Sequence, residues 1–67
     1  MITEIGLVAG DIWGYLEKQN DRTIDELAQE IGKSKSVVLM SAGWLAREGH
    51  ITLAEKGDTY TVTLRKS

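Results

Sequence analysis

Apolar positions recur at helical spacing in three stretches of this chain and then alternate with polar positions near its end. The first stretch covers residues 3–18, where an apolar side chain returns every three or four positions, which predicts a helix with one buried face. Thr3 is placed to cap this helix and Glu4 suits the positive end of its dipole. Its predicted core positions are Ile5, Val8, Ala9, Ile12 and Leu16.

A second, shorter helix is predicted over residues 23–31. Thr23 and Glu26 have the spacing of a capping box, in which the threonine hydroxyl accepts from the third amide and the glutamate reaches back. Gly32 follows the last apolar position, where a left-handed residue closes a helix at little cost. The predicted buried face consists of Ile24, Leu27, Ala28 and Ile31.

A third helix is predicted over residues 34–48, with Ser34 as its N-cap and Gly49 just past its end. Its core-facing positions are predicted to be Val38, Ala42 and Leu45. This choice leaves an outer face of Ser36, Met40, Gly43 and Arg47, with Val37 and Trp44 on one flank. Trp13 and Trp44 are both interpreted first as core residues and second as contact residues.

After residue 49 the apolar pattern changes to strict alternation, which predicts a β-hairpin over residues 50–64. Gly57 lies in the turn and supplies the positive φ that a tight hairpin needs. Arg22-Thr23 is too short for an independent strand but can pair beside the hairpin as a third strand. The predicted fold is α+β and mostly helical: three helices followed by a C-terminal hairpin, in one domain spanning residues 1–67.

Composition excludes several classes of protein. The chain of 67 residues has no cysteine, so neither disulfides nor a thiolate metal site can stabilise its small core. No apolar run is long enough to span a bilayer, and the N-terminus lacks a basic segment followed by an apolar one. We therefore expect a cytoplasmic protein. The lone histidine, His50, has no partners at ligand spacing and no glycine loop cradles phosphate, so we expect no enzyme activity, cofactor, metal or small-molecule ligand.

Charge is distributed unevenly along the chain. The net charge is −2, which argues against an indiscriminate nucleic-acid binder. Residues 1–30 hold seven acidic and two basic residues, whereas residues 31–67 hold three acidic and six basic residues. The positive half contains the third helix and the hairpin, so it is the half that would face a polyanion. The alternative explanation of the charge asymmetry is a solvated surface with unevenly distributed charge.

The order of helices, glycine turns and hairpin is similar to that of the winged helix-turn-helix superfamily. With the first helix included, the chain also resembles a family of small, stand-alone bacterial winged-helix domains of unassigned function. The resemblance rests on three segments, TIDELA at 23–28, IGKS at 31–34 and LAREGHI at 45–51.

This resemblance implies DNA binding, and with it transcriptional regulation, with the third helix in the major groove and the hairpin on the backbone or minor groove. The DNA contacts it implies are Lys33, Ser34, Lys35, Ser36, Arg47 and Lys56, with Arg65 and Lys66 following. Arg47 alone among the outer-face residues is a strong donor to base edges, so phosphate contact is better supported than base-specific reading.

A second hypothesis is a protein-interaction or self-association module that uses the same scaffold without binding DNA. Gly6, Gly10 and Gly14 lie four residues apart on the first helix, and each costs about 1 kcal/mol relative to alanine. Such a stripe is explained either by close packing within the chain, against Trp44 or the hairpin, or by contact with a second copy or another protein. The predicted interaction surface is Gly6, Gly10, Gly14, Met40 and Trp44.

Overall fold

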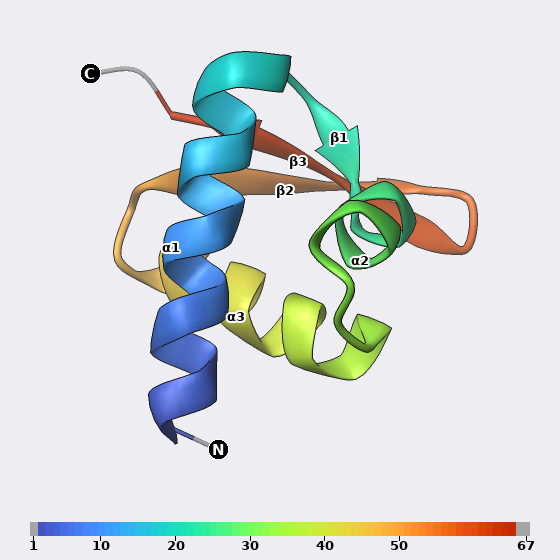
Figure 1. Cartoon of the computed structure of the whole chain (residues 1–67). Coiled ribbons are helices and arrows are strands. Elements are labelled where there is room, and N and C mark those ends of the chain that lie inside the picture. Colours follow the sequence, from blue (N-terminus) through green and yellow to red (C-terminus); the bar gives the residue numbers. More distant parts are fainter. Residues whose placement is uncertain (1, 66–67) are drawn as a thin grey trace.

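The computed structural model describes residues 2–65 and shows three helices and a small antiparallel sheet (Figure 1). The predicted fold class is confirmed, including the short third strand. The elements, in chain order, are α1 (Ile2–Gln19), β1 (Arg22–Thr23), α2 (Ile24–Ile31), α3 (Lys35–Arg47), β2 (Ile51–Lys56) and β3 (Thr59–Leu64).

Helix α1 begins earlier than the sequence predicts. Thr3 lies inside the helix rather than at its cap, because regular helical structure already includes Ile2. At the other end, the Asn20 amide donates to the Leu16 carbonyl over 3.1 Å, and Asn20 takes a positive φ of 67° that turns the chain toward β1. Asparagine is one of the few residues that adopt this left-handed conformation readily.

The capping signals predicted for α2 are present. The Thr23 hydroxyl accepts from the Glu26 amide over 3.1 Å, and the Glu26 carboxylate accepts from the Thr23 amide over 2.9 Å. Gly32 closes the helix with a φ of 79°. Because Thr23 is a cap and the last residue of β1, the helical bounds start one residue later than predicted.

Helix α3 is capped at both ends as its sequence indicates, although the helix itself is one residue shorter at each end than predicted. The Ser34 hydroxyl accepts from the Val37 amide over 3.2 Å. At the other end, the His50 amide donates to the Leu45 carbonyl over 2.9 Å while Gly49 has a φ of 82°. These bonds satisfy backbone groups that a helix terminus would otherwise leave unpaired.

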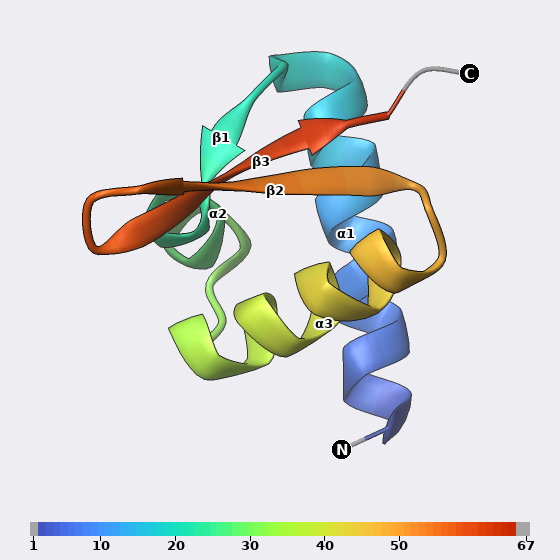
Figure 2. The same cartoon turned by 180° about the vertical axis from the view of Figure 1, so that it is seen from behind.

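The sheet has the strand order β1-β3-β2, so β3 is its central strand. In the hairpin, Ile51 pairs with Leu64 and Lys56 with Thr59, while Arg22 of β1 pairs with Val62. The wing therefore starts at residue 51 rather than 50. The helices pack on one side of the sheet: α1 lies in front of β2 and β3 in Figure 1 and behind them in Figure 2.

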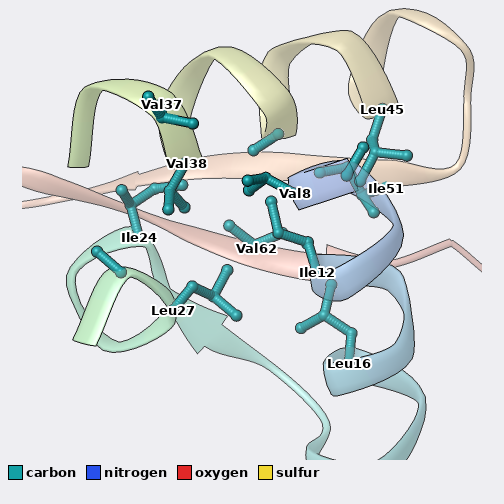
Figure 3. Close-up of a cluster of buried hydrophobic side chains, with 13 residues drawn as sticks. Val8, Ile12, Leu16, Ile24, Leu27, Val37, Val38, Leu45, Ile51 and Val62 are labelled. Carbon is teal, nitrogen blue, oxygen red and sulfur yellow. The ribbon is translucent and has the colours of Figure 1, made fainter. Parts of the chain in front are cut away.

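The core forms where α1, α2, α3 and the inner face of the sheet meet (Figure 3). Val37 points into this core and is only 9% exposed, so its predicted place on the outer flank of α3 is wrong. The third helix buries a wider stripe than predicted, which also includes Ser41. That side chain is fully buried and satisfies its hydroxyl by donating to the Val37 carbonyl over 2.8 Å.

Candidate nucleic-acid interface and apolar surface

The outer face of α3 is open to solvent along its length. The four residues predicted to lie there, Ser36, Met40, Gly43 and Arg47, are all exposed. Trp44 is 49% exposed, so its interpretation as a core residue is wrong. Leu39 is also exposed. The helix that a winged helix-turn-helix would insert into DNA thus presents three large apolar side chains and one arginine.

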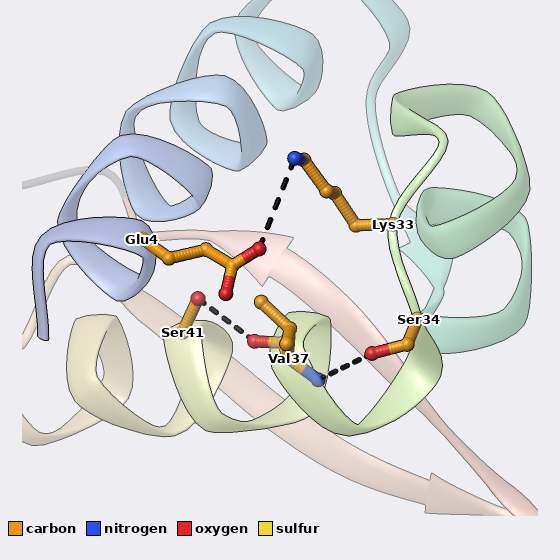
Figure 4. A network of polar contacts seen from close by, with 5 residues as sticks. All are labelled: Glu4, Lys33, Ser34, Val37 and Ser41. Carbon is orange, nitrogen blue, oxygen red and sulfur yellow. Dashed lines mark hydrogen bonds and ion pairs between the residues drawn. The ribbon is translucent and has the colours of Figure 1, made fainter. Parts of the chain in front are cut away.

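Both lysines near the start of α3 lie close to carboxylates. The Lys33 ammonium is 3.8 Å from a Glu4 carboxylate oxygen on α1 (Figure 4). The Lys35 ammonium is 3.3 Å from a carboxylate oxygen of Asp25 on α2. Pairs as exposed as these contribute little stability, so either lysine can exchange its partner for a phosphate. The two carboxylates offset part of the positive charge at the start of α3.

Asp25 connects the start of α3 to the wing. Besides pairing with Lys35, its carboxylate accepts a hydrogen bond from the Thr59 hydroxyl over 3.3 Å. Thr59 opens β3 and pairs directly with Lys56, so Lys56 belongs to the same region of the surface. The first turn of α2, the start of α3 and the tip of the wing therefore meet at one place.

The capping glutamate adds a second acidic group to this region. The hydrogen bond from the Thr23 backbone amide holds the pKa of Glu26 below its ordinary value, and the nearby positive charges of Arg22 and Lys56 lower that pKa further. Lys35 and Lys56 thus stand beside Asp25 and Glu26. The predicted cationic surface is close to electrically balanced.

The remaining predicted DNA contacts lie elsewhere on the domain than the place where α2, α3 and the wing meet at Asp25, or use their side chains within it. Ser34 uses its hydroxyl oxygen as the acceptor of the α3 cap, which leaves its O–H proton as a donor. Arg47 lies in the last turn of α3, and Arg65 is exposed just after β3. Lys66 lies outside the described residues. Sequence reasoning missed Asp25 and Thr59, because only tertiary packing brings the start of α2 against the wing.

The glycine stripe of α1 has no neighbour that explains it. A Cβ atom built on Gly6, Gly10 or Gly14 meets nothing within 4 Å among the described residues outside the helix's own backbone. Close packing of these glycines against Trp44 or the hairpin is therefore not the explanation. Near Gly6, a hollow of about 280 Å³ lies between α1 and α3. It is lined by Ile2, Ile5, Gly6 and Trp44.

Four ring-bearing side chains pack within the domain, away from the outer face of α3. The rings of Trp13 and His50 pack in a tilted arrangement with centroids 4.4 Å apart, so the residue just before β2 contacts α1. Tyr15 is half-buried, and its hydroxyl donates to a Glu30 carboxylate oxygen over 2.7 Å. That hydrogen bond raises the pKa of Tyr15 above its ordinary value. Tyr60, on β3, is partly buried and packs against the core.

The helix pair, its glycine turn and the attached hairpin define a winged helix-turn-helix. The family model described as "Winged helix-turn-helix domain (DUF2582)" matches residues 1–64, and the chain belongs to this family, whose function is not assigned. No curated protein matches the chain. Within residues 2–65, none of the helices is both long and apolar enough to cross a membrane.

A solved structure supports the same fold. It is the solution NMR structure of protein BT2368 from Bacteroides thetaiotaomicron, which is 27% identical in sequence to this chain. The match covers 92% of this chain and 76% of that protein, with a TM-score of 0.80. The similarity establishes the architecture, and the name of that protein carries no activity.

Proposed function

We propose that this domain binds duplex DNA, with α3 in the major groove and the wing tip on the sugar-phosphate backbone. The observation that carries the proposal is the junction at Asp25, which holds the start of α3 and the wing together so that Lys35 and Lys56 border one surface. A helix with an open outer face beside such a pair of cations has the arrangement that winged helices use to dock on DNA.

The exposed side chains of this surface are better suited to contact the sugar-phosphate backbone of DNA than to recognise base edges. Lys35 and Lys56 act as point charges for phosphates, and the exposed Ser36 hydroxyl adds a donor. Arg47 is the only residue on the outer face of α3 that can bond a guanine edge in a bidentate manner. Because Asp25 and Glu26 offset the lysine charges, we expect weak, salt-sensitive binding. Occupancy of regulatory DNA would make transcriptional control the corresponding biological role.

A titration of a labelled duplex of about 12 base pairs, followed by fluorescence anisotropy, tests this proposal. A duplex of this length holds about one domain, which removes any effect of two linked sites. Lys35→Glu and Lys56→Glu should each weaken binding about tenfold at low salt, since each replaces a phosphate partner by a repelling charge. Lys18→Glu is the matched control, because Lys18 lies in the last turn of α1 and makes the same change of charge away from α3.

The outcomes separate clearly. Loss of affinity in both variants, with the control unchanged, supports the proposed surface. Equal loss in all three variants would mean that binding follows net charge alone and not this surface. No measurable binding of the wild-type chain at 50 mM salt would rule out the function itself.

A second candidate function is a self-association module, favoured by the open glycine stripe of α1 and by the exposed apolar residues near it. Leu7 is 68% exposed and Ile2 is 87% exposed on α1, and Trp44 of α3 lines a hollow together with Gly6 of α1. Large apolar side chains gathered in this way on a small domain are typical of protein contact surfaces. Sedimentation velocity over a range of concentrations tests this candidate, and a monomer at every concentration would contradict it.

A further inference from the structure

The proposed phosphate contacts leave two apolar side chains of α3 without a role. Leu39, Met40 and Trp44 are all exposed on this helix. Trp44 has a neighbour in the domain, since it lines the hollow beside Gly6 of α1. Met40 and Leu39 lie further round the helix, at about 40° and 140° from Trp44. A solvent-exposed helix surface is normally polar, so these two side chains on the helix proposed to enter the groove call for a partner there.

The middle of the outer face of α3 carries no bulky side chain. Gly43 lies three residues after Met40 and in the same stripe as Ser36 and Arg47. A Cβ atom built on Gly43 meets nothing within 4 Å among the described residues outside the helix backbone, so packing within the chain does not require glycine there. Without a side chain at this point, the helix can lie close to the occupant of its outer face, and Met40 reaches the same occupant.

Positive charges border this uncharged stretch at both ends. Lys35 begins α3 and Arg47 ends it, so the two residues lie about 18 Å apart along the helix axis. The helix has no acidic residue between them; Glu48 follows at its C-cap, and Asp25 of α2 lies beside Lys35 at the other end. The major groove of DNA has the complementary pattern, because two rows of phosphates about 12 Å apart border the uncharged base edges.

The position of the wing brings the same half of α3 to the groove. In Figures 1 and 2 the hairpin turn lies at the end of the domain where α3 begins. Leu39 and Met40 lie in the first half of that helix. A duplex whose backbone contacts Lys56 at the wing tip therefore presents its base edges to these two side chains.

We propose that Leu39 and Met40 contact the C5-methyl groups of thymines, so that the domain prefers thymine-rich duplexes. This inference rests on the proposed function and names the DNA that the site selects. The thymine methyl is the apolar group that base pairs present in the major groove. Helix α3 contains no Asn or Gln that could bond an adenine edge, so contact with thymine methyls is the base contact that its apolar residues can make.

The size of this preference follows from the area of a methyl group. Removing one methyl-sized group from water against an apolar side chain changes affinity about fourfold. With one or two thymine methyls in contact, their loss should weaken binding about four- to fifteenfold. An apolar contact displaces no counterion, so this ratio should stay constant as salt is raised, while the affinity itself falls.

Fluorescence anisotropy with two labelled duplexes of about 12 base pairs tests the inference. Both duplexes have one sequence rich in A·T pairs, and the second carries deoxyuridine in place of every thymidine. Deoxyuridine lacks only the C5-methyl group and keeps the hydrogen-bonding groups of thymine. The wild-type chain should bind the thymine duplex about four- to fifteenfold more tightly. Conversely, a G·C duplex with 5-methylcytosine, which places a methyl at the same ring position, should bind more tightly than the unmethylated duplex.

Variants assign the preference to α3, with circular dichroism as the check on folding. Met40→Ala and Leu39→Ala should each lower the ratio of the two affinities, and the double variant should bring it close to one. Met40→Leu keeps an apolar side chain of similar size and should keep the preference. Leu7→Ala is the matched control, because it shortens an exposed leucine on α1 and should leave the ratio unchanged.

The outcomes separate this inference from the proposed function. Equal binding of the thymine and deoxyuridine duplexes would overturn the thymine contact while leaving DNA binding in place. A preference that persists in the double variant would overturn its assignment to Leu39 and Met40. No binding of the wild-type chain to any duplex at 50 mM salt would overturn the proposed function and this inference together.

Discussion

Lys35 and Asp25 form an ion pair of 3.3 Å between the first turns of α3 and α2, on the surface that we propose faces DNA. The aspartate also accepts a hydrogen bond from Thr59 of the wing. The Asp25 carboxylate thus links the start of α3 to the wing, and its negative charge would repel the phosphates of the proposed DNA ligand.

Replacing this carboxylate should strengthen DNA binding. In Asp25→Asn the repelling charge is lost and Lys35 is free to contact phosphate, while the amide oxygen can still accept from Thr59. We expect the affinity for a short duplex at low salt to rise about two- to fivefold, the range of an exposed charge pair. Asp21→Asn, which removes the same charge from the α1–β1 connection, is the matched control in the anisotropy titration. Weaker binding in Asp25→Asn would mean that the aspartate mainly orders the surface.

Substituting a glycine of the α1 stripe should stabilise the folded domain. A Cβ on Gly10 meets open space, so Gly10→Ala gains helix propensity without a clash. We expect the free energy of unfolding to rise by about 1 kcal/mol, measured by urea denaturation at a protein concentration of a few micromolar. Gly32→Ala is the contrasting variant, because its φ of 79° disfavours any side chain and the substitution should destabilise the domain.

The capping box of α2 should make stability depend on pH in the acidic range. The folded-state pKa of Glu26 is lowered, mainly by the Thr23 amide, so its contribution is present above the ordinary pKa of glutamate, about 4.3. That contribution is lost as the pH falls through the lower folded pKa. Urea denaturation at several pH values between about 3 and 6 should therefore show a smaller acid-induced loss in Glu26→Gln than in the wild type. Glu17→Gln, which removes a charge without removing a cap, should follow the wild-type profile.

Loss of the Thr23 hydroxyl cap should lower the free energy of unfolding at neutral pH. Thr23→Ala removes the acceptor for the Glu26 amide, and we expect the free energy of unfolding to fall by about 1 kcal/mol. Thr23→Ser keeps the acceptor and should lose less. Equal losses in the two variants would mean that the methyl group of Thr23, and not its hydroxyl, stabilises this helix.

The buried serine of α3 should tolerate a smaller side chain better than a larger one. Ser41 is fully enclosed and bonds only within its own helix. Ser41→Ala removes the donor and leaves the Val37 carbonyl in its helical environment, so we expect a loss of about 1 kcal/mol or less. Ser41→Leu overfills the contact and should cost about 1 to 3 kcal/mol by urea denaturation.

The parts of the fold that local chemistry determines could be predicted from sequence. The capping box at Thr23 and Glu26, the left-handed Gly32 and the turn at Gly57 each specify a backbone conformation by themselves. The pairing of Arg22-Thr23 beside the hairpin was also predicted, but its register against Val62 and Thr61 was not. The bounds of α2 and α3 differ by at most one residue from the prediction because their caps lie outside the regular helix, whereas α1 extends one residue further than predicted at each end.

Side-chain environments that depend on tertiary packing were harder to predict. Val37 and Trp44 lie at neighbouring angles around α3. Helical periodicity alone therefore could not predict that Val37 would be buried and Trp44 exposed. The pairing of Lys35 with Asp25 joins the starts of two helices, whose relative placement the sequence pattern does not specify. The assignment of the six candidate DNA contacts stays a prediction.

The salt dependence of DNA binding tests the central claim most directly. If Lys35, Arg47 and Lys56 each displace a counterion from duplex DNA, the logarithm of affinity should fall with the logarithm of salt concentration with a slope of about −2 to −3. Between 50 and 200 mM salt the wild-type chain should lose about 20- to 60-fold in affinity, and Lys35→Glu should reduce the slope by about one. Absence of binding at 50 mM salt, or a slope unchanged in Lys35→Glu, would contradict the account.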